Sequence, residues 1–234
     1  MIDYGPYPGA TDLSNVYIFN NVFRTVTMIN SVAPRYIRMY DTAGVGPTSL
    51  NNIKIMNNLF LDNTITASVT IFYSSTTDPT CSGNEMKNNI FYSGDSSQGF
   101  WWVGNTHWTH NPCFTFSNNV YYSPQVRSVA YLETIYTITD WMAANEAGAS
   151  TAQPSFVRYS PYDAFNDFHL LPSDIAAQNK GIDLSSSCSI ISELCKDKDS
   201  VTRPQGPAWD IGAYEYVPGG DTTSPAAPSS LAVK

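Results

Sequence analysis

Four copies of a short motif, each built around a pair of asparagines, occupy about the first half of the chain. They read NVYIFNNVF, NIKIMNNLF, NEMKNNIF and FTFSNNVY, and their second asparagines are Asn21, Asn58, Asn89 and Asn119. These asparagines recur at intervals of 37, 31 and 30 residues. A repeat of this length is typical of a solenoid, a propeller or an array, in which one supersecondary unit is copied along the chain.

The apolar residues around each pair fall into matched columns. Three residues before the second asparagine stand Ile18, Ile55, Met86 and Phe116, and one and two residues after it stand Val22-Phe23, Leu59-Phe60, Ile90-Phe91 and Val120-Tyr121. Before the pair the apolar residues alternate, as in a strand with one buried face. After the pair two apolar residues follow directly, so the alternation slips by one. Because asparagine tolerates the left-handed backbone conformation of a sharp turn, each repeat is predicted to be strand, bend, strand.

Stacking such units in register places equivalent residues about 4.8 Å apart. Asparagine above asparagine then forms an internal ladder of side-chain amides, each of which donates and accepts hydrogen bonds. Removing one amide, as in Asn58→Ala, is expected to cost about 1–3 kcal/mol because buried partners lose their hydrogen bonds. A propeller blade has a similar period, but the sequence lacks four hairpin signals in each repeat.

The repeated I-x-x-N-N-x-F resembles the right-handed parallel β-helix proteins of the pectate-lyase-like superfamily. The resemblance implies an all-β solenoid with three strands per coil and an asparagine ladder at one turn. We therefore expect about four to five coils in residues 1–138, with residues 1–14 as a leading loop. Three further apolar segments, at residues 36–40, 69–73 and 100–103, are assigned to the third strand of successive coils. Since this fold hosts many functions, the resemblance leaves the activity open.

Residues 139–217 are expected to form a C-terminal cap of the same domain. Thr139 is a candidate N-cap for a short helix over residues 140–147 that ends at Gly148, with Trp141, Met142 and Ala144 packed on the last coil. A terminal coil needs such a cover, because it otherwise exposes core and an unpaired edge.

The same region carries a second resemblance. The stretch DKDSVTRPQGPAWDIGAYEY is similar to the C-terminal end of secreted β-helix proteins called choice-of-anchor Q proteins. Within it we expect Arg203 and Asp210 to form a structural ion pair. Asp197 and Asp199 are conceivable Ca²⁺ ligands, but two carboxylates are too few for a site, so no cofactor and no metal are expected.

The chain is expected to be a piece of a longer secreted protein. Residues 218–229 have the Pro, Gly, Ser and Thr composition of a linker, and the last residues, to 234, resemble the first strand of a truncated fibronectin type III module. The first residues lack the features of a signal peptide. We therefore expect additional N-terminal coils and neighbouring domains in the natural protein.

Charge and cysteine content bound the environment. The net charge is −8 with no Lys/Arg run, and no apolar stretch reaches membrane-spanning length, so neither nucleic acid nor a bilayer is an expected partner. Cys81 lies eight residues before its ladder asparagine and Cys113 six before its own, so stacking brings them within disulfide distance. Cys188 and Cys195 can close a short loop. Paired cysteines favour an extracellular or cell-surface location, and four buried free thiols are the alternative.

The predicted function concerns the outer face of the third strands. With the isoleucines inward, Arg38, Tyr40, Phe72 and Trp101 face outward and form a candidate surface for an extracellular acidic polysaccharide. Candidate catalytic residues are Arg38, Asp41, His107 and His110, of which the histidines are the easier bases. Two function classes follow: a polysaccharide lyase or glycoside hydrolase, and a non-catalytic adhesive or structural module.

Overall fold

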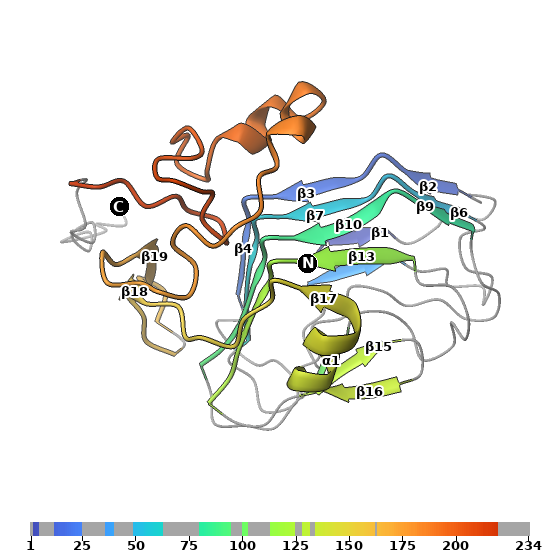
Figure 1. Cartoon of the computed structure of the whole chain (residues 1–234), viewed down its shortest axis with the longest axis horizontal. Helices are drawn as coiled ribbons and strands as arrows, with labels where there is room; N and C mark the ends of the chain where they lie inside the picture. Colours follow the sequence, from blue (N-terminus) through green and yellow to red (C-terminus); the bar gives the residue numbers. More distant parts are fainter. Residues whose placement is uncertain are drawn as a thin grey trace, which may run out of the picture.

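A computed structural model describes residues 2–4, 12–24, 36–39, 49–62, 80–94, 100–102, 113–124, 128–131, 134–161 and 163–219. In these residues, short parallel strands stack in register as the coils of a β-helix (Figure 1). The predicted all-β solenoid is therefore confirmed. Residues 220–234, which include most of the expected linker and the fibronectin-like segment, lie outside the described residues.

Three parallel sheets form the sides of the stack. The central sheet consists, in spatial order, of β3 (Tyr17–Phe19), β7 (Lys54–Met56), β10 (Asn84–Lys87), β13 (Phe114–Ser117) and β17 (Glu146–Ala147). The second consists of β4 (Val22–Arg24), β8 (Leu59–Asp62), β11 (Ile90–Ser93) and β14 (Val120–Tyr122). The third consists of β2 (Asp12–Ser14), β6 (Ser49–Asn51) and β9 (Thr80–Ser82).

Two sharp bends separate these sheets. The bend between the central and second sheets lies at the first asparagine of each pair, where Asn20, Asn57, Asn88 and Asn118 have φ of 56°, 52°, 56° and 53°. The bend between the third and central sheets uses the same left-handed conformation at Asn15, Asn52 and Gly83. The predicted asparagine bend is thus confirmed. The two asparagines of each pair have different roles: the first adopts the left-handed conformation at the bend, and the second forms the ladder.

The third sheet corrects the predicted leading loop over residues 1–14, because this segment contains β2 as well as β1 (Ile2–Tyr4). Strands β6 and β9 of the same sheet were not predicted. Their sequences are mostly polar, and each strand of the third sheet turns a single residue inward: Leu13, Leu50 or Cys81. With only one inward residue in each strand, the sequence shows no alternation of apolar and polar residues from which the strand could be predicted.

Two of the predicted additional strands are present. β5 (Ile37–Met39) pairs in parallel with β1, and β12 (Phe100–Trp102) pairs in parallel with β15 (Ser128–Tyr131). β15 then pairs antiparallel with β16 (Thr134–Thr137). The predicted strand at residues 69–73 lies outside the described residues.

The ladder follows the second asparagines. The backbone N–H and Nδ2 of Asn21 both donate to Oδ1 of Asn58, at 3.0 and 3.1 Å, and the same pair of bonds joins Asn58 to Asn89 and Asn89 to Asn119. Asn58, Asn89 and Asn119 are fully buried, whereas Asn21 is exposed. The predicted internal, structural ladder is confirmed.

Glu146 closes the ladder at its C-terminal end. Its Oε1 accepts the backbone N–H and Nδ2 of Asn119, and its Oε2 accepts the Tyr121 hydroxyl and Trp141 Nε1. Burial raises the pKa of Glu146, although these donors favour the carboxylate. A carboxylate suits a terminal position, because it accepts from every side and no further coil follows to receive a donor.

Aromatic rings fill the core beside the ladder. Phe23, Phe60, Phe91 and Tyr121 form a continuous stack with centroids 5.0 Å apart at each step and ring planes within 13° of parallel. The spacing follows directly from the strand spacing of the coils. Stacked rings of this kind add packing energy to the apolar area that they bury.

A short helix covers the last coil. Helix α1 (Ile138–Asn145) begins two residues earlier than expected, because Thr137 rather than Thr139 is its N-cap and accepts the backbone N–H of Asp140. Trp141 is fully buried and packs edge-on against Phe116, with centroids 4.9 Å apart. The expected contact of Ala144 is wrong, since this residue is exposed.

Residues 150–217, called the C-terminal flank below, pack along the side of the coils (Figure 1). The flank contains an antiparallel pair, β18 (Phe156–Arg158) and β19 (Asp167–Leu170), and two 3₁₀ turns, η1 (Ser185–Ser189) and η2 (Ser192–Cys195). Its apolar residues Phe156, Phe168 and Ile211 cover the outer side chains of the second sheet, including Leu59, Ile90 and Val120. The second sheet is therefore buried on both faces.

Both predicted disulfides are present. Cys81 and Cys113 are joined across neighbouring coils with their Cα atoms 5.1 Å apart, and Cys188 and Cys195 are joined within the flank at 5.7 Å. Two disulfides indicate an oxidising, extracellular environment. Among the residues described, no helix is long and apolar enough to cross a membrane.

Peptide mapping under non-reducing conditions tests this pairing. We expect one linked peptide pair containing Cys81 and Cys113 and one containing Cys188 and Cys195, because the paired Cα atoms lie at normal disulfide separations. A reduced and alkylated sample serves as the control. Recovery of alkylated cysteines without prior reduction, or of any other linked pair, would contradict the coil register.

Candidate functional site

The predicted polysaccharide surface is only partly within the described residues. Ile37 is fully buried, as its inward assignment requires, and Arg38 follows it in β5, paired in register with Asp3. Trp101 lies in β12 and pairs with Val129. In the described residues, the strands that carry Arg38 and Trp101 are not paired in one sheet. Tyr40, Asp41, Phe72, His107 and His110 lie outside the described residues.

The outer faces of the third and central sheets carry ordered rows of polar side chains. Ser49 Oγ donates to Asp12 Oδ1 at 2.7 Å, and Ser82 Oγ donates to Asn51 Oδ1 at 2.8 Å. At the bend between the sheets, Asn52 Nδ2 contacts both Asn15 Oδ1 and the Tyr17 hydroxyl at 2.7 Å. These contacts join equivalent positions on successive coils, so the surface repeats hydrogen-bonding groups along the stack.

A charged group continues this row on the central sheet. Glu85 lies between Lys54 on the preceding coil, at 2.9 Å, and Lys87 on its own strand, at 2.8 Å. Partial burial would raise the pKa of Glu85, but hydrogen bonds and charge from Lys87 and Lys54 outweigh it and hold the pKa below the usual range. The group carries one net positive charge. Lys54 Nζ also donates to the Gly83 carbonyl, and this bond holds the ammonium group against the protein surface.

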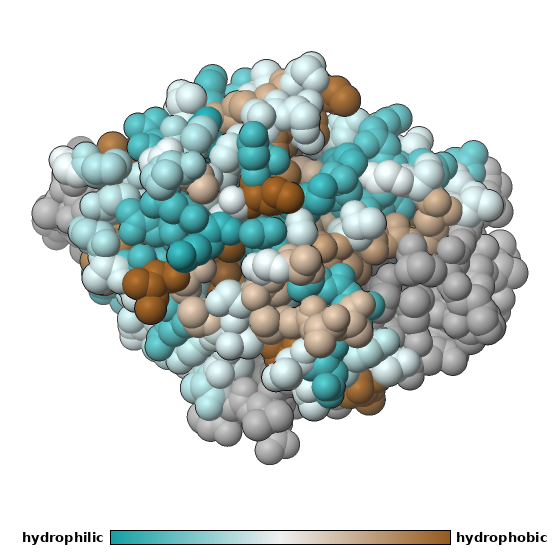
Figure 2. Space-filling model, viewed as in Figure 1, coloured by the Kyte–Doolittle hydropathy of each residue, from teal (hydrophilic) through white to brown (hydrophobic). Residues whose placement is uncertain are grey.

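We name the row of Asn15, Tyr17, Asn52, Lys54, Glu85 and Lys87 the polar row. On the face that Figure 2 presents, strongly hydrophobic residues occur as small separate spots among hydrophilic residues and an area of moderately hydrophobic ones. A surface of this kind fits a polar ligand better than an apolar one.

An aromatic group lies where the flank meets the second sheet. The Tyr92 ring is buried between Tyr122, at 4.9 Å, and Tyr159, which meets it edge-on at 5.0 Å, and its hydroxyl accepts Gln153 Nε2. Burial raises the pKa of Tyr92, with the neighbouring Tyr122 adding to the shift and Gln153 opposing it. The group fixes the flank to coils three and four.

His169 is held between two carboxylates in the flank. Its Nδ1 lies 2.5 Å from Asp167 Oδ1, its Nε2 lies 2.8 Å from Asp199 Oδ2, and its ring packs on Tyr214 with centroids 4.2 Å apart. Partial burial would lower the pKa of His169, but the two aspartates outweigh it and raise the pKa above 6.5. Since both ring nitrogens are engaged, this histidine is a clip that joins β19 to the segment after η2, where Asp199 lies, rather than a free general base.

The clip makes stability depend on pH. Because the folded-state pKa of His169 is raised, its contribution is fully present below pH 6.5 and is lost as the pH rises through the folded-state value. We expect the difference in unfolding free energy between wild type and His169→Gln to shrink across that window. Denaturant titrations of both proteins from acidic to mildly alkaline pH measure it. A constant difference would show that the imidazolium adds nothing.

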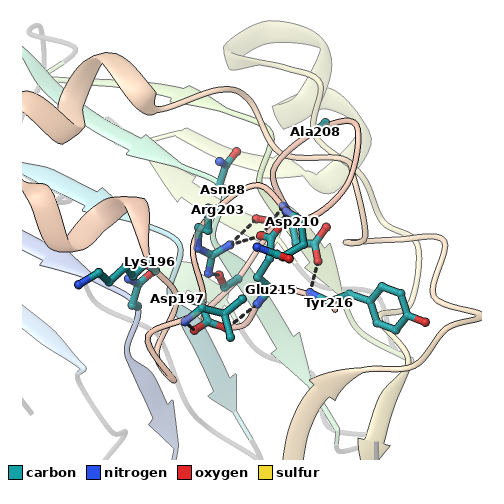
Figure 3. Close-up of polar contacts among 12 residues, drawn as sticks. Asn88, Lys196, Asp197, Arg203, Ala208, Asp210, Glu215 and Tyr216 are labelled. Carbon is teal, nitrogen blue, oxygen red and sulfur yellow. Dashed lines mark hydrogen bonds and ion pairs between the residues drawn. The ribbon is translucent and has the colours of Figure 1, made fainter. Parts of the chain in front are cut away.

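A buried ionic cluster organises the flank (Figure 3). Arg203 Nη1 forms an ion pair with Glu215 Oε2 at 3.0 Å and also donates to the Asp210 carbonyl, and Nη2 donates to the Gly212 carbonyl. The expected pairing of Arg203 with the Asp210 carboxylate is therefore wrong. That carboxylate instead accepts the backbone N–H groups of Asn179 and Tyr216.

The carboxylates of this cluster serve the backbone. Burial, reinforced by Glu215, raises the pKa of Asp210 to about 7, and burial likewise raises the pKa of Glu215. Asp197 accepts the N–H groups of Asp199, Val201 and Glu215, so its oxygens are occupied by the fold (Figure 3). Among the described residues no three potential metal ligands gather.

The flank motif DIGAYEY is fixed to the coils through a glycine. The N–H of Gly212 donates to the carbonyl of Asn88, and Gly212 has φ +99°, which disfavours any side chain. A Cβ there would lie 2.6 Å from Ile90 Cδ1. Asn88 also exchanges two hydrogen bonds with the backbone of Ile182. The DIGAYEY motif thus docks the flank on the coils.

The comparisons with known proteins give no relative. No protein-family model, no curated protein and no solved structure matches this chain.

Sequence reasoning missed three parts of these surfaces. The alignment of Asn15, Asn52 and Gly83, each six residues before a ladder asparagine, was a usable signal for the second bend and the polar row. The partnership of Lys54 with Glu85 follows once the coils are aligned. The His169 clip had no comparable signal, because Asp199 lies thirty residues away in an irregular segment.

Proposed function

We propose that this protein is an extracellular β-helix that binds an acidic polysaccharide along the outer face of its coils. The observation that carries the proposal is the polar row, in which amide groups at Asn15 and Asn52 and ammonium groups at Lys54 and Lys87 lie on successive coils, with the Tyr17 phenol beside them. A polymer of repeating sugars presents hydroxyl and carboxylate groups at regular intervals, so a repeating array of donors suits it. The predicted groups at Arg38, Tyr40, Phe72 and Trp101 would extend this surface.

Charge bears on the ligand class. The chain carries −8 overall, which repels a polyanion, so binding requires local positive charge. Lys54 and Lys87 supply it on the central sheet, where Glu85 neutralises only one of them. A uronate carboxylate would approach the two ammonium groups from outside. The resulting attraction falls with added salt.

Titration calorimetry with uronate oligosaccharides, and with neutral glucan oligosaccharides for comparison, tests the proposal. We expect Lys54→Ala/Lys87→Ala to weaken uronate binding several-fold and to reduce its salt dependence. Arg158→Ala/Lys198→Ala, two exposed positions in the flank, is the matched control for charge. An equal loss of uronate affinity in both double variants would show that only the net charge of the protein matters. Absence of uronate binding by the wild type would contradict the proposal.

Catalysis is tested in the same samples. A lyase forms unsaturated uronate, followed by ultraviolet absorbance, and a hydrolase releases reducing ends without that absorbance. Arg38→Ala/Trp101→Ala examines the predicted groove, and His107→Ala/His110→Ala examines its candidate bases. Turnover that depends on these residues would assign the chain to the enzyme class, and binding without turnover would assign it to the binding class.

A non-catalytic structural module is the second candidate function. The contacts of Ser49 with Asp12, and of Ser82 with Asn51, favour it, because these surface groups already satisfy one another between coils. A shaft needs only such a regular, self-paired exterior. Under this alternative no glycan binds and the double lysine variant changes stability alone.

A further inference from the structure

The two ends of the asparagine ladder are chemically different. At the C-terminal end the buried Glu146 carboxylate accepts four hydrogen bonds, and Trp141 of α1 covers it. At the N-terminal end Asn21 is exposed. The C-terminal end of the ladder therefore finishes in a carboxylate, which only accepts hydrogen bonds. The N-terminal end finishes in an asparagine of the same kind as the interior ones.

The exposed rung lacks the bonds that every interior rung makes. Oδ1 of Asn58 accepts two N–H donors from the coil before it, whereas Oδ1 of Asn21 has no donor among the described residues. Nδ2 of Asn58 and Asn89 also donates to a carbonyl of the preceding coil, that of Ile18 or Ile55. Nδ2 of Asn21 donates to Phe19 of its own coil, as Asn58 does to Met56, but among the described residues it donates to no carbonyl of a preceding coil.

The strands around Asn21 lie at the edges of their sheets. β2, β3 and β4 are each the terminal strand in the described part of the third, central and second sheets. Phe23 is partly exposed, whereas the equivalent Phe60 and Phe91 are fully buried. The stack also extends beyond this coil at one position, since β1 pairs in parallel with β5.

We propose that this N-terminal edge binds a further β-coil, a polypeptide segment with the strand–Asn–Asn–strand pattern of the chain's own repeats. Its second asparagine would donate its backbone N–H and Nδ2 to Asn21 Oδ1. The carbonyl three residues before that asparagine would accept Asn21 Nδ2, as Ile18 does for Asn58. The apolar residue two positions after it would stack on Phe23, as Phe23 stacks on Phe60.

Ladder polarity selects this occupant over a second copy of the chain. A head-to-tail copy would offer its sealed end, where α1 and the Glu146 carboxylate lie and no amide donor faces outward. A copy joined edge to edge would run its strands in the opposite direction. Its asparagine could not then reproduce the paired donation of N–H and Nδ2 to one Oδ1 that parallel stacking gives.

A peptide with the sequence of residues 51–62, NNIKIMNNLFLD, provides the probe. We expect the fluorescently labelled peptide to bind the whole chain, measured by anisotropy, and to raise its unfolding temperature. The same peptide with the Asn58→Ala change should bind about tenfold more weakly, since it loses the donor to Asn21. Asn21→Ala in the protein should weaken the parent peptide similarly, and Ser82→Ala on the outer face should leave binding unchanged.

The outcomes separate the alternatives. Equal binding of the two peptides, or no binding of either, overturns the proposal, and this comparison uses only the wild-type protein. Concentration-dependent dimerisation that the peptide fails to displace would assign the edge to a second copy and would also overturn it. None of these results depends on whether the outer face binds polysaccharide.

Discussion

Replacing Arg203 with alanine is expected to lower the free energy of unfolding by about 3–5 kcal/mol, because it leaves buried carboxyl groups without their cation. Arg203 and Glu215 have fully buried side chains 3.0 Å apart, and the guanidinium also binds the carbonyls of Asp210 and Gly212. These carbonyls belong to the segment that docks on Asn88. The substitution should therefore loosen the flank from the coils, which equilibrium denaturation will measure.

The pH dependence of Arg203→Ala adds a second readout. Without the guanidinium, the raised pKa values of Asp210, about 7 in the wild type, and Glu215 should rise further. A raised carboxyl pKa gives stability that is present at low pH and lost as the pH rises through it. The deficit should thus be larger at pH 8 than at pH 5. Arg158→Ala, an exposed ion pair, should cost less than about 1 kcal/mol; a similar loss in both variants would contradict the argument.

Asn89→Ala is expected to cost about 4 kcal/mol. The alanine removes the acceptor of the buried Asn58 N–H and the donor to the Ile55 carbonyl, and each orphaned buried group costs about 1–3 kcal/mol. It also leaves a small void between coils two and four, because Asn89 is fully buried. Chemical denaturation monitored by tryptophan fluorescence gives the change in midpoint and slope.

The matched control is the same substitution at the end of the ladder. Asn21→Ala removes the Nδ2 bonds to Asn58 Oδ1 and to the Phe19 carbonyl, at an exposed position where water replaces them, so its cost should stay below about 1 kcal/mol. Equal midpoints for the Asn89 and Asn21 variants would mean that the ladder bonds contribute little beyond their exchange with water.

Local repetition explains what the sequence could predict. The asparagine pairs and the alternating apolar residues depend on neighbours in the chain, so the central and second sheets, the bend and the ladder were all foreseeable. The third sheet was not, since its strands are polar with one inward residue each, such as Leu13 and Leu50. Coil alignment also gave the Cys81–Cys113 pair, because equivalent positions in adjacent repeats must meet.

Contacts between distant irregular segments explain what the sequence could not predict. Arg203 pairs with Glu215 rather than Asp210 because the chain turns at Gly212 and presents the Asp210 carbonyl, not its side chain, to the guanidinium. Glu146 continues the ladder although its sequence context is a helix C-terminus, so no asparagine marks the last rung. The predicted polysaccharide residues remain predictions, as only Arg38 and Trp101 fall on described strands.

The lengthwise course of the C-terminal flank changes how the stack comes apart. In a simple solenoid each coil contacts only its neighbours, so terminal coils can fray one at a time. Here the flank restrains coils at both ends of the stack. The carbonyl of Lys196 accepts from Asn20 and that of Asp163 accepts from Arg24, both in the first coil. The carbonyl of Lys180 accepts from Asn118 in the fourth coil. Residues 163–196 thus tie together coils that lie far from them in the sequence. Unfolding becomes one cooperative event, and folding must wait for contacts that span more than a hundred and seventy residues.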